Sequence, residues 1–409
     1  MSTAPPPLGP IKSLQELVDF LQRTGSRLPV NMFQATGHVI AETENFLRMR
    51  FLGEIRPDVP YLLILPQTDF AFAMARTYAS QFLVVAVNDQ WNSLVREVAL
   101  YHPELTVDVG VSHFKATVPP GRRTRIREFN NQFWHMLPRD EAIGLTTALY
   151  RRRAQSRAYR PLWHDRPLPA PVAERIGQPG KYALIHLKVH SINATAQATD
   201  PDTYLDALAY LHDNGFRLVM AGREPMPEAF RRFPIYHYGG DPLASFENDL
   251  ILFRHARFAL LAGSGISYLA ENFDVPFVYA NYWHLCFPPF ARRAVALPSI
   301  LSVRDTGATL PFSQHYGLLQ RFPEFSFWNF PHETLAARPA SASEILAATR
   351  EALSLSGEEL PPPSPLQQRF NAMDPIGCAR ISDSRVSQHF LEKFAGLMDG
   401  ADHMATAGL

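Results

Sequence analysis

The apolar residues of this chain follow two spacings, and the change from one to the other predicts alternating helices and strands. Between residues 12 and 24 they recur three and four apart, as on one face of a helix. Short uninterrupted apolar runs predict buried strands, and helical spacing returns between them. In the first half, strands are expected at 28–34, 61–66 and 82–87, and helices at 39–51, 88–101 and the arginine-rich stretch 125–157.

The second half of the chain repeats this alternation more regularly. Strands that alternate with helices along a sequence form parallel sheets covered by helices. The predicted fold class is therefore α/β, with two facing Rossmann-like domains. In the second half, strands are expected at 182–187, 216–221, 258–262 and 276–280, and helices at 200–214, 245–255 and 266–273.

Proline, with 35 residues, indicates where the domains end. Residues 161–171 are rich in proline and cannot continue a helix. The amphipathic residues 385–398 are expected to form a helix that packs back across the domains. We expect a first domain over 1–160, a linker over 161–180, a second domain over 181–360 and an extension over 361–409.

The composition narrows the class of protein. Of the 409 residues, 46% are hydrophobic and 19% are charged, which is typical of a globular chain. The formal net charge is +0, so we expect no nucleic-acid partner, and any anion site must be local. No stretch reaches the roughly 18 apolar residues of a membrane helix, and the N-terminus lacks a signal peptide pattern. Cys286 and Cys378 lack metal-ligand spacing, which favours reduced thiols in a cytoplasmic protein.

The sharpest chemical signal is the segment Gly263-Ser264-Gly265-Ile266-Ser267. It follows an apolar strand directly and precedes a helix. Its glycines let a ligand approach the backbone, and amides at a helix start together with serine hydroxyls suit a phosphate. Because the segment is neither a G-x-G-x-x-G motif nor a Walker A motif, a dinucleotide or P-loop site is not indicated. The alternative is a tight turn that needs small residues.

Two other strands of the second half end in groups that suit a phosphate. His186 and Lys188 lie two residues apart at the end of one strand, so they point to the same side. Arg223 follows Gly222 at the end of the next strand, and a guanidinium matches the geometry of a phosphate. Ligands of α/β sheets bind at the carboxyl ends of the strands. The alternative for each residue is an exposed polar position.

In the first half, one helix start carries two titratable residues. His38 and Glu42 lie four residues apart, which places them on one helix face. They suit either an acid/base pair or a catalytic base with its orienting partner. The alternative is that the acidic residues only complement the dipole of the helix.

Two further motifs are weak signals. Asp200-Pro201-Asp202 has the form of a metal-carrying DxD motif, but the pattern around it favours a helix cap. The arginines at 122, 123, 125, 127 and 151–153 read as a solvated helix face or a site for an acidic acceptor. We therefore expect no metal site and no cofactor.

The chain resembles a bacterial family of GT-B-fold glycosyltransferases that is distantly related to heptosyltransferases and O-fucosyltransferases. The resemblance lies in short segments that together span most of the chain. The first comprises Gly37-His38, Glu42 and 45–48, and the second comprises 184–188, 204–207 and Gly222. The third comprises Asp249-Leu250, Phe258, Ser264-Gly265, Val275-Pro276 and Asn281. The fourth is 379–382. The family has His-x-Arg where this chain has His186-Leu187-Lys188, and an Arg-Asn pair where it has Gln197-Ala198.

The resemblance implies two facing domains, with a nucleotide-sugar donor in the C-terminal one and the acceptor mainly in the N-terminal one. It implies sugar transfer without a metal, to an acceptor that is a glycan, a small molecule or a protein. Glu271 would then bind a ribose hydroxyl of the donor, with an exposed helix residue as the alternative. Two other functions stay open: a nucleotide-sugar epimerase of the same fold, and a non-catalytic nucleotide-binding or scaffold relative, which Lys188, Gln197 and Ala198 favour.

Overall fold

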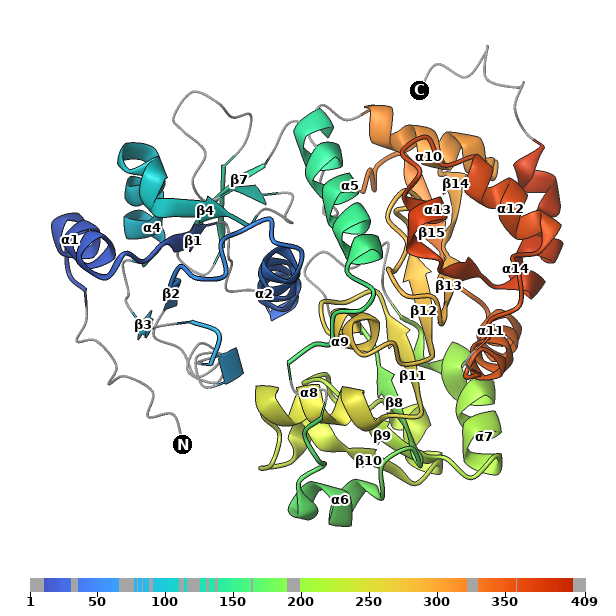
Figure 1. Ribbon diagram of the computed structural model, residues 1–409. Helices are drawn as coiled ribbons and strands as arrows, with labels where there is room; N and C mark the ends of the chain where they lie inside the picture. Colours follow the sequence, from blue (N-terminus) through green and yellow to red (C-terminus); the bar gives the residue numbers. More distant parts are fainter. Residues whose placement is uncertain are drawn as a thin grey trace. The chain divides into compact units, whose positions relative to one another are not determined.

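The computed structural model divides the chain into two compact units, essentially residues 1–162 and 163–409 (Figure 1). The structure describes residues 11–30, 36–65, 77–78, 80–82, 84–87, 91–109, 114–115, 126–129, 132–136, 139–162, 165–189, 199–321, 330–357 and 359–399.

The first unit is built from parallel strand pairs and helices. Strand β1 pairs with β4 and β2 pairs with β3, each pair in parallel, and a bridge between Arg27 and Tyr61 links the pairs. Its elements are α1 (Leu14–Thr24), β1 (Leu28–Val30), α2 (Thr36–Phe51), β2 (Leu62–Leu65), β3 (Val84–Val87), α4 (Trp91–Tyr101), η1 (Pro103–Leu105), β4 (Thr106–Asp108), β5 (Phe114–Lys115), β6 (Ile126–Phe129), β7 (Gln132–Met136) and α5 (Arg139–Gln155).

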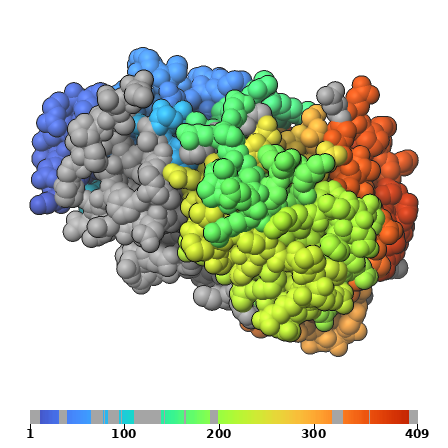
Figure 2. Space-filling model, turned by 90° about the horizontal axis from the view of Figure 1, so that it is seen from below, coloured from blue at the N-terminus to red at the C-terminus, as the bar shows by residue number. Residues whose placement is uncertain are grey.

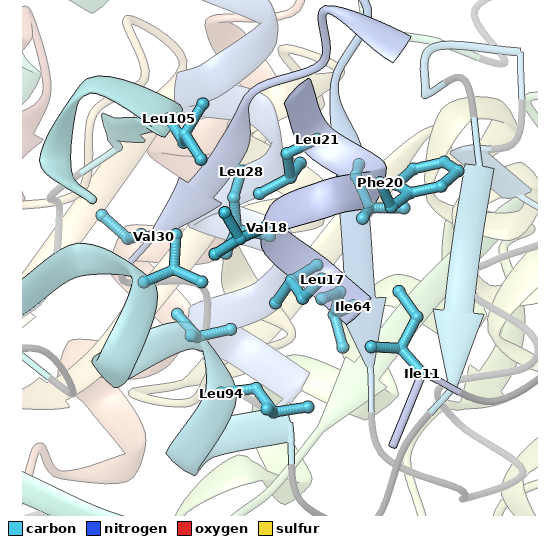
Figure 3. Close-up of a cluster of buried hydrophobic side chains, with 13 residues drawn as sticks. Ile11, Leu17, Val18, Phe20, Leu21, Leu28, Val30, Ile64, Leu94 and Leu105 are labelled. Atoms are coloured by element: carbon cyan, nitrogen blue, oxygen red, sulfur yellow. The ribbon is translucent and has the colours of Figure 1, made fainter. Parts of the chain in front are cut away.

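Local sequence explains where α1 begins and ends, and its apolar face explains where it packs. Ser13 accepts a hydrogen bond from the backbone N–H of Glu16, and Gly25 closes the helix at a φ of 65°. The face that carries Leu17 and Leu21 packs against β1, β2 and α4, in the apolar cluster shown in Figure 3. This cluster is the core of the first unit's parallel strands.

The stretch 125–157 is not one helix, contrary to the prediction. Strands β6 and β7 form an antiparallel hairpin in which Phe129 pairs with Gln132, and only then does α5 begin. The arginine-rich composition favoured a helix, and the apolar residues of β6 and β7 do not alternate regularly with polar ones. The prediction failed because two strands of five residues or fewer leave almost no period-two signal.

The second unit is a seven-stranded sheet in the order β10-β9-β8-β11-β12-β13-β16, and every pair in it is parallel. In Figure 1, α7 and α11 lie on one side of this sheet and α8 and α9 on the other. The expected α/β fold class is confirmed. The sheet strands are β8 (Tyr182–His186), β9 (Arg217–Met220), β10 (Ile235–His237), β11 (Phe258–Ala262), β12 (Phe277–Tyr282), β13 (Ala294–Pro298) and β16 (Arg385–Val386).

The strands at the centre of this sheet are fully buried, which is why they read as continuous apolar runs. An antiparallel pair, β14 (Ile300–Val303) and β15 (Leu335–Arg338), follows the sheet. The helices are α6 (Ala170–Ile176), η2 (Pro201–Tyr204), α7 (Leu205–Asp213), η3 (Glu228–Arg232), η4 (Tyr238–Gly240), α8 (Phe246–His255), α9 (Ser267–Asn272), α10 (Phe312–Arg321), α11 (Ala342–Ser354), α12 (Pro365–Ala372), α13 (Cys378–Ser382), α14 (Gln388–Lys393) and η5 (Ala395–Met398). Helix α6 lies within the segment expected as a linker.

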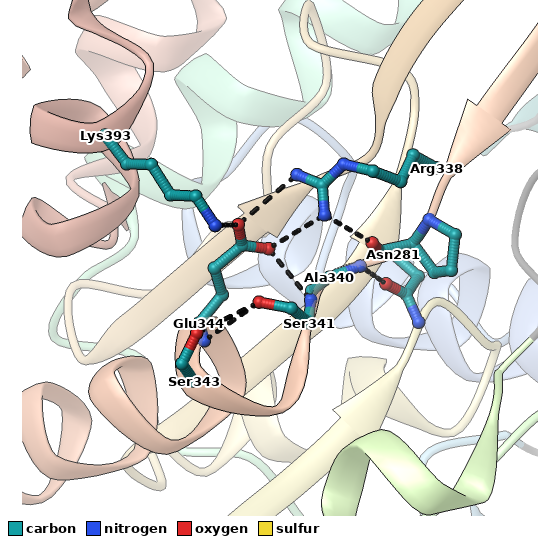
Figure 4. A network of polar contacts seen from close by, with 8 residues as sticks. Asn281, Arg338, Ala340, Ser341, Ser343, Glu344 and Lys393 are labelled. Atoms are coloured by element: carbon teal, nitrogen blue, oxygen red, sulfur yellow. Dashed lines mark hydrogen bonds and ion pairs between the residues drawn. The ribbon is translucent and has the colours of Figure 1, made fainter.

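The C-terminal extension is tied to the second unit by a buried carboxylate (Figure 4). Residues 385–398 are not one helix as expected, because β16 adds to the sheet beside β13 before α14 begins. Glu344 accepts hydrogen bonds from Lys393 at 2.7 Å and from the backbone N–H of Ser341 at 2.9 Å, with Arg338 at 3.3 Å. Burial raises the pKa of Glu344, but these donors outweigh it and hold the pKa below its usual value.

Candidate functional site

The strand order of the second unit places a topological switch point between β8 and β11. The chain runs from β8 to β9 and β10 on one side, and then crosses to β11 on the other side. Ligands of open α/β sheets bind at the carboxyl ends of the strands at such a point. In the β8–β11 register, His186 pairs with Leu261, two residues before Gly263. The predicted residues of β8 and β11 therefore meet at one edge of the sheet.

His186 is a neutral, buried group at this edge. Its side chain is 8% exposed, and burial together with the charge of Lys188 lowers the pKa of its imidazole to about 4. Among the described residues, none forms a hydrogen bond with its Nδ1. A buried ring nitrogen to which no described residue bonds suits a hydrogen bond to a ligand.

Gly222 makes room for this ring. It adopts a φ of 84°, and a Cβ at this position would lie 2.6 Å from Cδ2 of His186. The backbone of Gly239, after β10, in turn touches the carbonyl of Gly222, because a Cβ on Gly239 would lie 1.5 Å from that oxygen. The lack of a side chain at Gly222 and Gly239 thus lets the ends of β8 and β9 pack closely against each other and against the segment after β10.

Two cations, Lys188 and Arg223, follow the strands at this edge. Burial lowers the pKa of Lys188, and the carboxylate of Glu224 acts in the opposite direction. Arg223 is exposed. Figure 2 shows the segment around β9 and β10, lime to yellow-green, at the surface. Gln197 and Ala198, which the resemblance singled out, lie outside the described residues.

Asp249 was part of the resemblance but not among the predicted site residues. It lies on α8, is half-buried, and burial raises the pKa of its carboxyl to about 7 although the nearby charge of Arg223 lowers it.

The turn from Gly263 to Ser267 satisfies some of its own donors. The backbone N–H of Ser267 donates to the carbonyl of Ser264 at 3.1 Å, and the Ser267 hydroxyl donates to the same oxygen at 2.6 Å. Ser267 is 2% exposed, so its hydroxyl stabilises the turn. The N–H groups of Ser264 and Gly265 donate to no described residue. These two amides are the ones the turn can offer to a ligand.

The glycines of this turn are not required by backbone conformation. Neither Gly263 nor Gly265 belongs to the described glycines with positive φ. The expected helix dipole contributes less than predicted, because α9 has only 6 residues and its N-cap, Ile266, makes no side-chain hydrogen bond.

Glu271 lies on α9 and is half-buried. Its charge contributes to the raised pKa of Tyr279, after burial and the effect of Tyr268. This places the carboxylate near the Tyr279 hydroxyl of β12. A role in ribose binding stays a prediction.

The catalytic candidates of the first unit lie on α2. This helix begins at Thr36, so Gly37 and His38 belong to its first turn rather than to a turn before it. The structure describes the helical backbone of His38 but not its side chain. Glu42 is 0% exposed. A carboxylate at this depth suits an orienting partner better than a group that takes a proton from an acceptor directly.

The arginine cluster does not form one basic patch on the described residues. Arg152 pairs with Glu54 at 2.8 Å and donates to the side chain of Asn45 at 2.9 Å. Arg153 is 3% exposed and its charge, with that of Arg48, opposes the effect of burial on the pKa of Glu44. The arginines of α5 thus fasten this helix to α2. Arg122, Arg123 and Arg125 lie outside the described residues.

The described residues contain no group of three or more His, Cys, Asp or Glu side chains placed to hold a metal ion. Asp200 accepts a hydrogen bond from the backbone N–H of Asp202 at 3.1 Å and so caps η2, as its sequence context indicated. Among the helices that the structure describes, none has the length and apolar character needed to span a bilayer.

Neither a family model nor a curated protein matches the sequence. Several solved structures are similar to it. The E. coli heptosyltransferase WaaC with ADP is 13% identical over 67% of this chain and 91% of that chain, with a TM-score of 0.35. The glycosyl transferase family 9 structure from Veillonella parvula is 12% identical over 80% of this chain and 97% of that chain, with a TM-score of 0.41.

The iron-containing dodecameric glycosyltransferase TibC from enterotoxigenic E. coli is 17% identical over 64% of this chain and 59% of that chain, with a TM-score of 0.38. Heptosyltransferases are the enzymes to which the sequence resemblance pointed.

Proposed function

We propose that the second unit binds a nucleotide sugar through its phosphates, and that the chain is a glycosyltransferase that moves the sugar to an acceptor without a divalent metal. One observation carries this proposal. Three neighbouring strands, β9, β8 and β11, end in Arg223, in His186 and Lys188, and in the turn Gly263–Gly265. Cations, a neutral imidazole and two backbone amides at a switch point can stabilise the charge of a leaving diphosphate.

Binding to nucleotides tests this site directly. In calorimetry with ADP, GDP, UDP, dTDP and their glucose derivatives, we expect at least one to bind. Arg223→Ala should then weaken binding about 10–100-fold, the value of a charge-assisted hydrogen bond to phosphate. Arg217→Ala is the matched control, because Arg217 is an exposed arginine at the opposite end of the same strand. If none of these nucleotides binds, or if Arg223→Ala and Arg217→Ala lose affinity equally, the proposed site is wrong.

A non-catalytic nucleotide-binding protein is the second candidate. The full burial of Glu42 and the lysine at 188 in place of the family's arginine favour it. Lysine keeps the positive charge but lacks the planar fork of arginine. Binding without hydrolysis or transfer of any sugar nucleotide, with every acceptor class tried, would support this candidate over the enzyme.

We predict that transfer needs no divalent metal. On the described residues no side chains are grouped to hold one, and Asp200 caps η2 instead. Turnover of the sugar nucleotide found by calorimetry should therefore be unchanged within about twofold after treatment with EDTA, since cations and amides can stabilise the leaving group. Loss of turnover that magnesium, manganese or iron restores would contradict this prediction.

We predict that His38 is the catalytic base and that Glu42 orients it. A hydroxyl acceptor is a weak nucleophile near neutral pH, so a base contributes about 10²–10⁴-fold. His38→Ala should lower kcat by this range. Glu42→Gln, which keeps the side-chain volume, should lower it less.

Donor affinity separates this prediction from a folding defect. The proposed nucleotide site lies in the other unit, so both variants should bind the nucleotide as the unaltered chain does. If both variants keep normal turnover, the base lies elsewhere. If either variant loses nucleotide affinity together with turnover, the proposed division of labour between the units is wrong.

A further inference from the structure

The segment around the end of β10 contacts the backbone on both sides of Arg223. Strands β10 and β9 pair in parallel, so their carboxyl ends lie at the same edge of the sheet. Gly239 packs on the carbonyl of Gly222, directly before Arg223. The Nε2 atom of His237 donates a hydrogen bond to the carbonyl of Glu224, directly after Arg223, at 3.0 Å. The two carbonyls that flank Arg223 are thus both held by one short segment.

His237 links a strand of the sheet to a segment without regular structure. It is the last residue of β10, whereas residues 221–227 belong to no helix or strand. Because a carbonyl oxygen only accepts hydrogen bonds, the Nε2 atom of His237 carries the proton of this bond. Side chains on strands keep their positions more precisely than side chains on loops. His237 can therefore hold the segment around Arg223 in one conformation.

The segment that carries this contact is itself fixed by side chains. Asp241 accepts a hydrogen bond from the backbone N–H of Leu243 at 2.7 Å, and the hydroxyl of Tyr236 also donates to Asp241. Tyr238 donates its hydroxyl proton to the carbonyl of Leu243 at 3.1 Å. Asn248 of α8 donates to the same carbonyl at 2.8 Å. These bonds tie the segment after β10 to α8 and make it a firm support for its neighbours.

We propose that His237 is a positioning residue for the phosphates of the nucleotide, because its hydrogen bond to Glu224 holds the backbone of Arg223 in the conformation that binds them. This inference rests on the proposed nucleotide site. Arg223 is exposed on a segment that has no helix or strand of its own. Without His237, this segment would have to be ordered at the moment a ligand binds, and such ordering weakens affinity. The hydrogen bond orders the segment before the ligand arrives.

Two amide replacements of His237 test the hydrogen bond, and both are polar enough for this half-buried position. Glutamine places its amide nitrogen as many bonds from Cβ as Nε2 of histidine, whereas asparagine is one bond shorter. Calorimetry with ADP, GDP and UDP measures affinity. His237→Asn should bind the tightest of these about 5–10-fold more weakly than the unaltered chain, the value of one hydrogen bond. His237→Gln, and the control His212→Asn at an exposed position of α7, should stay within about twofold.

A double-mutant cycle with Arg223 separates positioning from a general structural role. If His237 acts through Arg223, adding His237→Asn to Arg223→Ala should change affinity by less than about twofold. An equal loss with and without Arg223 would overturn the inference, as would equal affinities of His237→Asn and His237→Gln. In those cases a loss in Arg223→Ala alone leaves the nucleotide site standing. If Arg223→Ala binds normally, or none of the three nucleotides binds, the nucleotide site is wrong and this inference with it.

Discussion

Replacing Gly265 by aspartate is expected to weaken nucleotide binding at least about 100-fold while the protein stays folded. The N–H groups of Ser264 and Gly265 donate to no described residue, and a phosphate on these amides would meet the new carboxylate directly. Like charges in contact at a partly buried site cost several kcal/mol, and about 2.7 kcal/mol already corresponds to 100-fold. The φ of Gly265 is not positive, so the backbone can accept a side chain.

Gly265→Asn is the matched control, because asparagine has the same shape without the charge. Gly265→Asn should bind the nucleotide about 10-fold more weakly than the unaltered chain, which is the part of the loss that comes from side-chain bulk. Calorimetry with the tightest nucleotide measures affinity, and thermal unfolding confirms the fold. Equal losses in the two variants would mean that no anion lies on this turn. Unchanged affinity in both would remove the turn from the site.

Replacing Gly239 by alanine is expected to destabilise the second unit by about 3 kcal/mol or more. The new Cβ would lie 1.5 Å from the carbonyl oxygen of Gly222, and a backbone atom cannot move aside without shifting the strand end. For a unit of this size, such a loss lowers the midpoint of thermal unfolding by about 6–12 °C. Calorimetric unfolding measures the shift.

The neighbouring glycine provides the control. A Cβ on Gly240 would lie 3.2 Å from Nδ1 of His237, the end of a side chain that can rotate. Gly240→Ala should therefore cost less than about 1 kcal/mol. Similar midpoints for the two variants would contradict the close contact between Gly222 and Gly239. That contact also orders the end of β9, so nucleotide affinity should fall in Gly239→Ala where the protein remains folded.

Four strands of the second unit, β8, β9, β11 and β12, were predicted because their burial leaves a run of apolar residues with little to interrupt it. β8, β9 and β11 begin and end within one residue of the predicted runs. The hairpin β6–β7 was mistaken for a helix, and residues 385–398 were not recognised as a strand followed by a helix. Both errors concern strands of two to five residues, in which hydrophobic periodicity is too short to outweigh composition.

By itself, the sequence determined that strand ends bearing His186, Lys188, Arg223 and the turn at Gly263 belong to one parallel sheet, because helix–strand alternation permits little else. Only the tertiary structure decided which of these groups a ligand can reach. It buries the Ser267 hydroxyl, which bonds within its own turn, and it buries Glu42. Accessibility and pKa depend on neighbours distant along the chain, which no local pattern encodes.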